Sequence, residues 1–105
     1  MKRRYLALQI EAEKMPSERE LIDAVWSSVV QLYGEFGASQ TGLALISYNV
    51  ESNSTVIRTA LAALDMVRAS IALITALAGT KASVHILAIS GTIKSLGPVP
   101  LRRKK

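Results

Sequence analysis

The sequence predicts an α+β fold in which two helices cover one face of a four-stranded antiparallel sheet. Three observations lead to this prediction. Apolar residues alternate with polar ones, or form short apolar runs, in four stretches, as they do in strands. Two other stretches place apolar residues at steps of three and four, the spacing of a helix that buries one side. The 105 residues suffice for one domain with a single core, and 50% of them are hydrophobic.

The first half of the chain predicts a strand at residues 4–12 and a helix that begins at Ser17. In the strand, the side chains expected to face the core are Leu6, Leu8 and Ile10. Ser17 and Glu20 have the S-x-x-E spacing of a capping box, which satisfies free amides at a helix start. The apolar stripe of the helix contains Leu21, Ile22, Val25, Trp26, Val29, Leu32, Tyr33 and Phe36. Gly34 and Gly37 are expected to end this helix.

The second half predicts a hairpin, a second helix and a last strand. These elements are a strand at residues 43–50, a turn at 51–54, a strand at 55–59, a helix at about 60–77 and a strand at 83–89. Gly79 is expected to end the second helix. After the last strand we expect a short helical turn, and then an extended basic tail at residues 97–105, where glycine and proline oppose regular structure. The predicted domain therefore covers residues 1–96.

The element order is strand, helix, strand, strand, helix, strand, which is the split βαβ, ferredoxin-like (RRM-like) pattern. Right-handed crossovers place both helices on the same face of the sheet. The usual strand order is 4-1-3-2, so the start of the first strand lies beside the end of the fourth. We therefore expect the basic residues at 2–4 to meet those from Lys94 onward at one edge of the sheet.

The net charge of +5 comes from the two ends of the chain. The body from Tyr5 to Ile93 holds all eight acidic residues and five basic ones, so it is mildly acidic. Basic ends are typical of proteins that bind a polyanion such as RNA or an anionic membrane. The alternative is that these charges only keep a small protein in solution.

The composition also bears on the compartment of the protein. The chain has no cysteine, which excludes disulfides and thiolate chemistry and fits a reducing compartment. Gln9, Glu11 and Glu13 interrupt the first apolar run, which argues against a signal peptide. The most apolar later run contains Asp65 and Arg68, which argues against a membrane span. We expect a cytoplasmic protein.

No catalytic or metal-binding group of residues is evident. His85 is the only histidine and lies among apolar neighbours, which favours a structural role over a ligand or a base. Glu11 and Glu13 share a side of the first strand but lack partners that would make them an acid–base pair. We expect no cofactor bound by this chain and no active site in it.

RNA recognition, if it occurs, is expected to rest on phosphates rather than on stacked bases. The third strand has no aromatic residue and the first has only Tyr5, so base stacking is disfavoured. Arg58 is expected to face outward with Val56 and to reach a phosphate; an ion pair with Glu11 is the alternative. The turn at Thr92 and Lys94 is a second candidate, with a plain helix cap by Thr92 as its alternative.

These arguments give two sets of candidate residues. The candidates for RNA binding are Lys2, Arg3, Arg4, Arg58, Thr92, Lys94, Arg102, Arg103, Lys104 and Lys105. The outer sheet face is expected to be partly apolar and to bind a protein, and the candidates there are Tyr48 and Val56.

Several segments of the chain resemble a known family. The residues that carry the resemblance are RRYLALQIEAE at 3–13, VWSSVVQLYGEFGAS at 25–39, NSTVIRTA at 53–60, DMVRASIALITALAG at 65–79 and HILAISGTIKSL at 85–96. Together they resemble ribonuclease P protein component 2 of archaea, which has eukaryotic relatives in RNase P and RNase MRP. Many relatives carry a longer basic leader before the segment that begins here at MKRRY.

The resemblance implies a subunit of the ribonucleoprotein that removes the 5′ leader from precursor tRNA. It implies that the catalyst is RNA and that Mg²⁺ binds to that RNA. It also implies a partner, protein component 3, and self-association into a two-plus-two assembly. The alternatives without RNA are a ferredoxin-like interaction or small-ligand regulatory domain and, more weakly, a protein attached to membranes by its basic ends.

Overall fold

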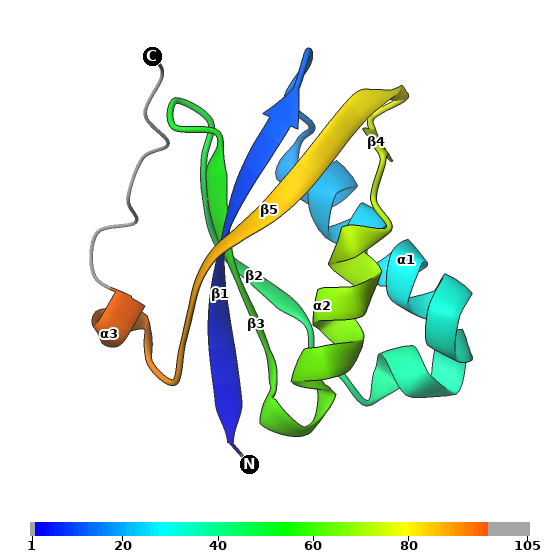
Figure 1. The fold of residues 1–105 in the computed structure, drawn as a ribbon, viewed down its shortest axis with the longest axis vertical. Coiled ribbons are helices and arrows are strands. Elements are labelled where there is room, and N and C mark those ends of the chain that lie inside the picture. The colour runs from blue at the N-terminus through cyan, green and yellow to red at the C-terminus, as the bar shows by residue number, and fades with distance from the viewer. Residues whose placement is uncertain (1, 97–105) are drawn as a thin grey trace.

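The computed structural model describes residues 2–96, which form a sheet with two longer helices on one side (Figure 1). Its elements are β1 (Arg3–Ala12), α1 (Glu18–Ser39), β2 (Ala44–Asn49), β3 (Ser54–Ala60), the 3₁₀ helix η1 (Leu61–Ala63), α2 (Leu64–Ala72), β4 (Ala76–Leu77), β5 (Thr80–Ser90) and α3 (Ile93–Leu96). The predicted tail lies outside the described residues. No helix of the described part is long and apolar enough to cross a membrane.

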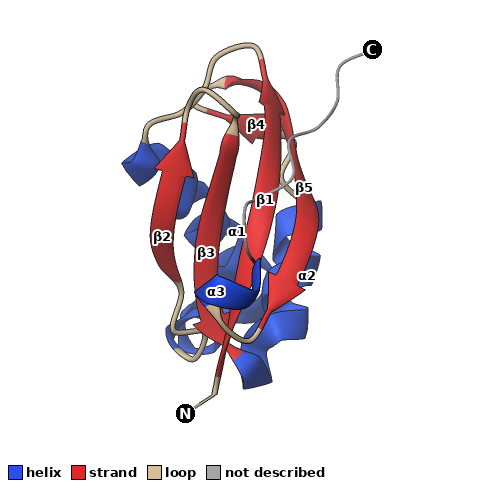
Figure 2. Cartoon of the chain, turned by 90° about the vertical axis from the view of Figure 1, so that its left-hand side faces the viewer, coloured by secondary structure: helices blue, strands red, loops and turns tan. Residues whose placement is uncertain are grey.

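The sheet has five strands in the order β2-β3-β1-β5-β4, and every neighbouring pair is antiparallel. The four long strands follow the order predicted from the sequence, with β1 between β3 and β5. The predicted number of four strands is wrong, because β4 adds a fifth at the edge. Figure 2 shows α1 and α2 behind the sheet and α3 in front of it.

The core lies between the sheet and the two helices α1 and α2. Its fully buried side chains come from β1, β3 and both helices, and they include Leu6, Leu8, Ile10, Ile57, Leu21, Val25 and Val67. Burying one such side chain contributes about 1.5–3 kcal/mol, so β1 is held mainly from this face. Ser28 of α1 also donates a hydrogen bond of 2.6 Å to the Ser70 carbonyl of α2, which ties the two helices together.

Helix α1 begins as the sequence predicts but continues farther. The capping box is present: Glu20 N donates to Ser17 Oγ at 3.1 Å, and Ser17 N donates to Glu20 Oε1 at 2.8 Å. The prediction that Gly34 ends the helix is confirmed in part, because the helical backbone is interrupted at this residue. Gly34 takes a left-handed conformation with φ of +77° and makes a kink, and helical backbone resumes and runs to Ser39.

The second predicted helix is shorter than expected. The sequence predicts helix to residue 77, but α2 ends at Ala72 and the chain then forms β4, which pairs with the start of β5. Ile74 and Leu77 are three residues apart and both are buried, at 8% and 1% exposure. The same burial is therefore achieved by an extended backbone, and Ala78 and Gly79 make the turn with positive φ. Strand β5 accordingly starts at Thr80 instead of residue 83.

Candidate functional site

The sheet face opposite α1 and α2, called here the open face, carries the outward residues of β1. They alternate with the core residues of the same strand and are Tyr5, Ala7, Gln9 and Glu11. The neighbouring strands extend these positions into rows: Tyr5 lies between Arg58 and Ser90, Ala7 between Val56 and Ala88, and Gln9 between Ser54 and His85. Helix α3 lies on this side of the sheet, near the Tyr5 end (Figure 2).

The Tyr5 end of the open face is the basic end of the molecule. Lys2, Arg3 and Arg4 lead into β1, Arg58 lies beside Tyr5, and Lys94 is exposed on α3. Arg4 Nη1 donates to the Arg3 carbonyl at 2.9 Å, and it lies 3.2 Å from the place where a Cβ atom on Gly91 would stand. The start of the chain therefore meets the turn after β5, as the predicted topology requires.

Acidic residues are missing from the segments that form this end. None occurs in residues 2–10, 54–60 or 80–96, and the two ion pairs found within residues 2–96 lie elsewhere, at Arg19–Asp23 and at His85–Glu11. The basic end therefore has a positive field that no carboxylate of these segments reduces. Thr92 is exposed beside this end, and its amide donates to Ser90 Oγ at 3.3 Å.

Arg58 occupies the middle of the basic end. The predicted orientation of β3 is confirmed, because Ile57 lies in the core while Arg58 and Val56 lie in the rows of the open face. The Nε atom of Arg58 is buried and has no hydrogen-bond acceptor in the described part of the chain. A buried donor without an acceptor costs about 1–3 kcal/mol, so this placement of a guanidinium group opposes stability.

An ion pair between Arg58 and Glu11 does not form. Glu11 Oε1 pairs with His85 Nε2 at 3.5 Å, and Glu11 lies six residues along β1 from Tyr5, the neighbour of Arg58. Six residues of strand span roughly 20 Å, which is too far for an arginine and a glutamate to meet. The alternative reading of Arg58 as the partner of Glu11 is therefore wrong.

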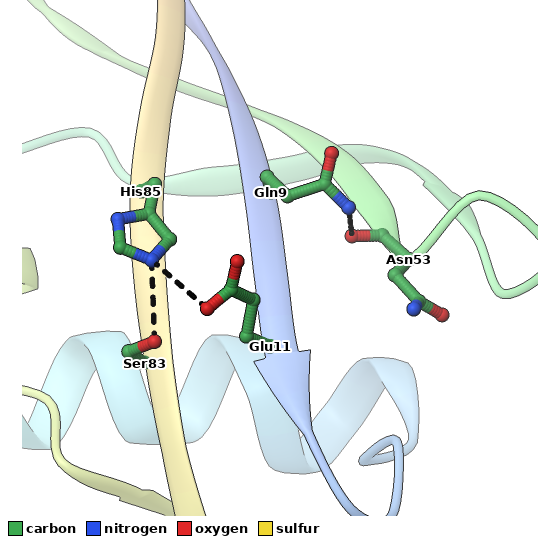
Figure 3. A network of polar contacts seen from close by, with 5 residues as sticks. All are labelled: Gln9, Glu11, Asn53, Ser83 and His85. Carbon is green, nitrogen blue, oxygen red and sulfur yellow. Dashed lines mark hydrogen bonds and ion pairs between the residues drawn. The ribbon is translucent and has the colours of Figure 1, made fainter. Parts of the chain in front are cut away.

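The other end of the open face is a network of polar contacts (Figure 3). Ser83 Oγ and Glu11 Oε1 both approach His85 Nε2, at 3.2 and 3.5 Å. A serine nucleophile with a relay needs the hydroxyl on one ring nitrogen and the carboxylate on the other. Because both groups meet the same nitrogen, these three residues cannot act as a triad. The histidine has hydrogen-bonding neighbours on the sheet, the structural role that the sequence favoured.

Gln9 belongs to the same end and was missed by the sequence reasoning. Its side chain is 5% exposed, and its Nε2 donates to the carbonyls of Ser52 and Asn53 at 3.0 and 3.2 Å. It thereby fastens the β2–β3 turn to the central strand (Figure 3). The only signal in the sequence was a large amide side chain at an outward position of an otherwise apolar strand.

The two residues predicted for a protein interface are largely covered. Tyr48 lies against the core, and its hydroxyl donates a hydrogen bond to the Pro16 carbonyl, which ties β2 to the start of α1. Burial, and then the nearby carboxylates of Glu18 and Glu20, raise the pKa of Tyr48 above its ordinary value of 10.0. Val56 lies on the open face but is 7% exposed. Their role at an interface stays a prediction.

A larger apolar surface lies on α1. Four side chains of the stripe predicted to face the core are instead exposed, at 40% to 79%: Trp26, Leu32, Tyr33 and Phe36. We call them the α1 patch. The core takes Leu21, Val25 and Val29 from this helix, and Ile22 and Ala24 pack partly against it, because a helix buries one narrow face. Exposed clusters of aromatic side chains are typical of protein interfaces.

The described residues contain no group of three His, Cys, Asp or Glu side chains that could hold a metal ion. Of the predicted RNA-binding residues, Lys2, Arg3, Arg4, Arg58, Thr92 and Lys94 lie at or beside the basic end. Arg102, Arg103, Lys104 and Lys105 lie outside the described residues. The described residues therefore offer basic side chains at one end of the sheet and exposed apolar side chains on α1, with Lys2 lying near the end of α1 beside Gln40 and Met66.

Comparison with known proteins gives one consistent family. Residues 4–97 match the model of the Rpp14/Pop5 family. Ribonuclease P protein component 2 of Archaeoglobus fulgidus is 37% identical over 94 residues, which cover 89% of this chain and 83% of that protein. The protein of the same name from Pyrococcus furiosus is 30% identical over 95 residues, 90% of this chain and 79% of that protein.

The fold has a counterpart among solved structures. A chain in the cryo-EM structure of yeast ribonuclease MRP superposes with a TM-score of 0.72 at 17% identity. The match covers 87% of this chain and 75% of that chain. Identity this low supports a shared fold and carries no residue roles.

Proposed function

Because the chain belongs to the Rpp14/Pop5 family, we propose that it is a protein subunit of ribonuclease P, the ribonucleoprotein that cleaves the 5′ leader from precursor tRNA. Relatives from several archaea carry the name ribonuclease P protein component 2, and they align with nearly the whole chain. In this proposal the catalyst is the RNA, Mg²⁺ binds to the RNA, and this chain binds no cofactor. The place of action is the cytoplasm.

The observation that carries the RNA-binding part of the proposal is the basic end of the open face. Its cations come from separate parts of the chain and have no carboxylate among their neighbouring segments. Catalytic RNA brings crowded phosphates together, and side-chain cations reduce the repulsion between them. Lys2, Arg3, Arg4 and Lys94, joined by residues 102–105 of the tail, would act in this way and lower the Mg²⁺ concentration that the RNA needs.

The α1 patch supports the second part of the proposal, binding of a protein partner. The partner proposed from the family resemblance is ribonuclease P protein component 3, with self-association into a two-plus-two assembly. Trp26, Tyr33 and Phe36 would supply aromatic anchors of the kind that dominate protein interfaces. With cations at the end of the sheet and an exposed apolar surface on α1, one molecule would be able to bind RNA and protein together.

The test is single-turnover cleavage of precursor tRNA by the cognate RNase P RNA at limiting Mg²⁺, with and without this protein and component 3. We expect cleavage to be fastest when both proteins are present and the Mg²⁺ requirement to fall. If a homologous protein pair stimulates the same RNA and this pair does not, the proposal is wrong. The chain would then be an interaction domain without an RNA role, and the α1 patch would be its candidate binding surface.

A further inference from the structure

Helix α1 bends at Gly34, and the bend changes the direction of Phe36 (Figure 1). Gly34 has φ of +77° and ψ of 172°, a conformation that is essentially restricted to glycine. A Cβ atom at this position would meet nothing within 4 Å, so the glycine is needed for its backbone conformation and not for space. Phe36 comes two helical turns after Val29, and a straight helix would place both on one side. Val29 is fully buried, whereas Phe36 is 79% exposed, because the bend turns it outward.

The segment after the bend is held against α2. A Cβ atom on Gly37 would stand 3.3 Å from Met66 Cε and 2.8 Å from Tyr33 Cβ, so only glycine allows this close approach. Ala38, in the same segment, is fully buried. Phe36 is therefore an exposed ring on a backbone that is already fixed, which lowers the entropy cost of binding through it.

A pocket of about 440 Å³ opens beside this segment, between the end of α1 and the start of α2, and we call it the η1 pocket. Its walls are mainly apolar, and its lining includes Lys2, Gln40, Leu61, Ala62 and Met66. Phe36 and Gln40 are four residues apart, the spacing of neighbours on one side of a helix, so the exposed ring lies beside the pocket and does not fill it. A cavity of about 150 Å³ can hold a benzene ring, so the η1 pocket has room for a phenyl group.

The lining of the η1 pocket is suited to an aromatic ring that has an acidic neighbour. The thioether of Met66 and the ammonium group of Lys2 both make favourable contacts with aromatic rings. Lys2 is exposed and belongs to neither ion pair of residues 2–96. Glu35, which precedes Phe36, is exposed as well and belongs to neither pair. A copy of Phe36 that enters the pocket therefore brings a carboxylate toward Lys2.

We propose that Phe36 inserts into the η1 pocket of a second copy of this chain, whose own Phe36 inserts into the η1 pocket of the first. A second copy is favoured over another protein because one surface offers both an exposed ring and a pocket that suits a ring. The two lie side by side, so a two-fold axis between them lets both insertions form together. This inference rests on the proposed function and deepens it: it assigns self-association to the part of α1 after the bend and leaves Trp26, before the bend, for component 3.

Two substitutions remove the two halves of the proposed contact. Phe36→Ala removes the ring, and Ala62→Trp, at an exposed position of η1, fills the pocket. Because both positions are exposed, the unfolding midpoint should hardly change. We expect each variant to weaken self-association about tenfold or more, as measured by analytical ultracentrifugation over a range of concentrations. Val50→Ala, at an apolar position that is 56% exposed, is the matched control and should self-associate like the unaltered protein.

A mixture of the two variants tests whether the insertion is reciprocal. In a mixed pair, the Ala62→Trp chain keeps its ring and the Phe36→Ala chain keeps its pocket, so one of the two contacts can form. We expect this mixture to associate more tightly than either variant alone and less tightly than the unaltered protein. A mixture that associates no better than its components would overturn the proposal. So would an unaltered protein that stays monomeric, or a Phe36→Ala protein that self-associates normally.

Binding of component 3 separates the proposal from its alternative. We expect Phe36→Ala to bind component 3 with unchanged affinity but to form a one-plus-one complex in place of a two-plus-two assembly. If Phe36→Ala instead weakens binding of component 3 and leaves self-association intact, the ring binds component 3 and the proposal is wrong. If the protein self-associates through Phe36 but does not stimulate an RNase P RNA that a homologue stimulates, the proposed function fails and the self-association stands.

Discussion

The two ends of the open face are made from the same three strands but are completed differently. At the Gln9 end, polar side chains contact each other: Glu11 and Ser83 reach His85, and Gln9 Nε2 binds the β2–β3 turn, although Gln9 Oε1 is buried without a hydrogen-bond partner in the described part of the chain. At the basic end, Arg58 leaves a buried donor without an acceptor in residues 2–96, and no carboxylate lies in the neighbouring segments. Because each end holds one buried polar atom without a partner among the described residues, the two ends differ in charge and not in hydrogen bonding. A carboxylate meets a histidine at the Gln9 end, whereas cations gather at the basic end, which favours binding of an anion there.

The largest expected effect comes from removing charge at the basic end. We expect Arg3→Gln, Arg4→Gln and Lys94→Gln together to lower the salt slope of RNA binding by about 2–3, at roughly 0.7–0.9 for each phosphate contact. Because exposed charges contribute little to folding, the unfolding midpoint should hardly change. Filter binding of the RNase P RNA across a salt series measures the slope.

The matched control for this prediction is the neutralisation of three exposed cations elsewhere, Lys14, Arg68 and Lys81, to glutamine. If this control lowers the slope as much as the first variant does, RNA binding depends on the net charge of the protein and not on the basic end. The contrast between the two ends would then be wrong.

A smaller effect is expected from breaking the structural end. Gln9→Ala removes the two hydrogen bonds to the β2–β3 turn and should lower the free energy of unfolding by about 1–2 kcal/mol. RNA binding by the folded protein should stay the same, since the basic end is untouched. Urea unfolding measures the loss, and Gln40→Ala, at an exposed position, serves as control. A variant as stable as the original would show that Gln9 does not fasten the turn.

The smallest effect concerns Tyr48, on the covered side of the sheet. Its pKa is raised in the folded protein, so the unfolded chain ionises first as the pH rises past about 10. The unfolded state then binds fewer protons, and stability falls above that pH. Tyr48→Phe should cost about 1 kcal/mol at neutral pH through loss of the bond to the Pro16 carbonyl, and it should remove part of the alkaline decline. Unfolding midpoints measured between pH 8 and pH 11 test this prediction, with Tyr33→Phe as the control variant. If the two variants lose stability alike as the pH rises, the prediction is wrong.

What the sequence could predict depends on how local the cause is. The capping box at Ser17 and the alternation of β1 are decided by neighbouring residues, and both were predicted correctly. The strand order followed from the usual arrangement of strands in the split βαβ pattern. The end of α2 was not predictable in this way. Ile74 and Leu77 have helical spacing, and both are buried although the backbone there is not helical. Apolar periodicity reports burial, and the backbone conformation is a further inference.

The candidate site shows the same division. The outward position of Arg58 was predicted from the parity of β3, and the meeting of the two chain segments at Gly91 from the topology. The bonds of Gln9 to the turn join residues more than forty positions apart and leave no trace in a local pattern. Eight apolar residues of α1 fit one helical stripe, which predicts that the side chains of the α1 patch are buried. They are exposed because the rest of the protein covers only part of that stripe.

Because β1 lies in the middle of the sheet, the sheet can be completed only late in the synthesis of the chain. Its last neighbour, β5, pairs Ser90 with Tyr5, so the strand made first during synthesis waits for almost the whole chain. Contacts between such distant residues slow folding, since a long loop must close before they form. Until then the apolar run at residues 5–10 has open edges that can pair with other chains. A newly made molecule therefore passes through an interval in which protection of its N-terminal segment decides between a folded subunit and an aggregate.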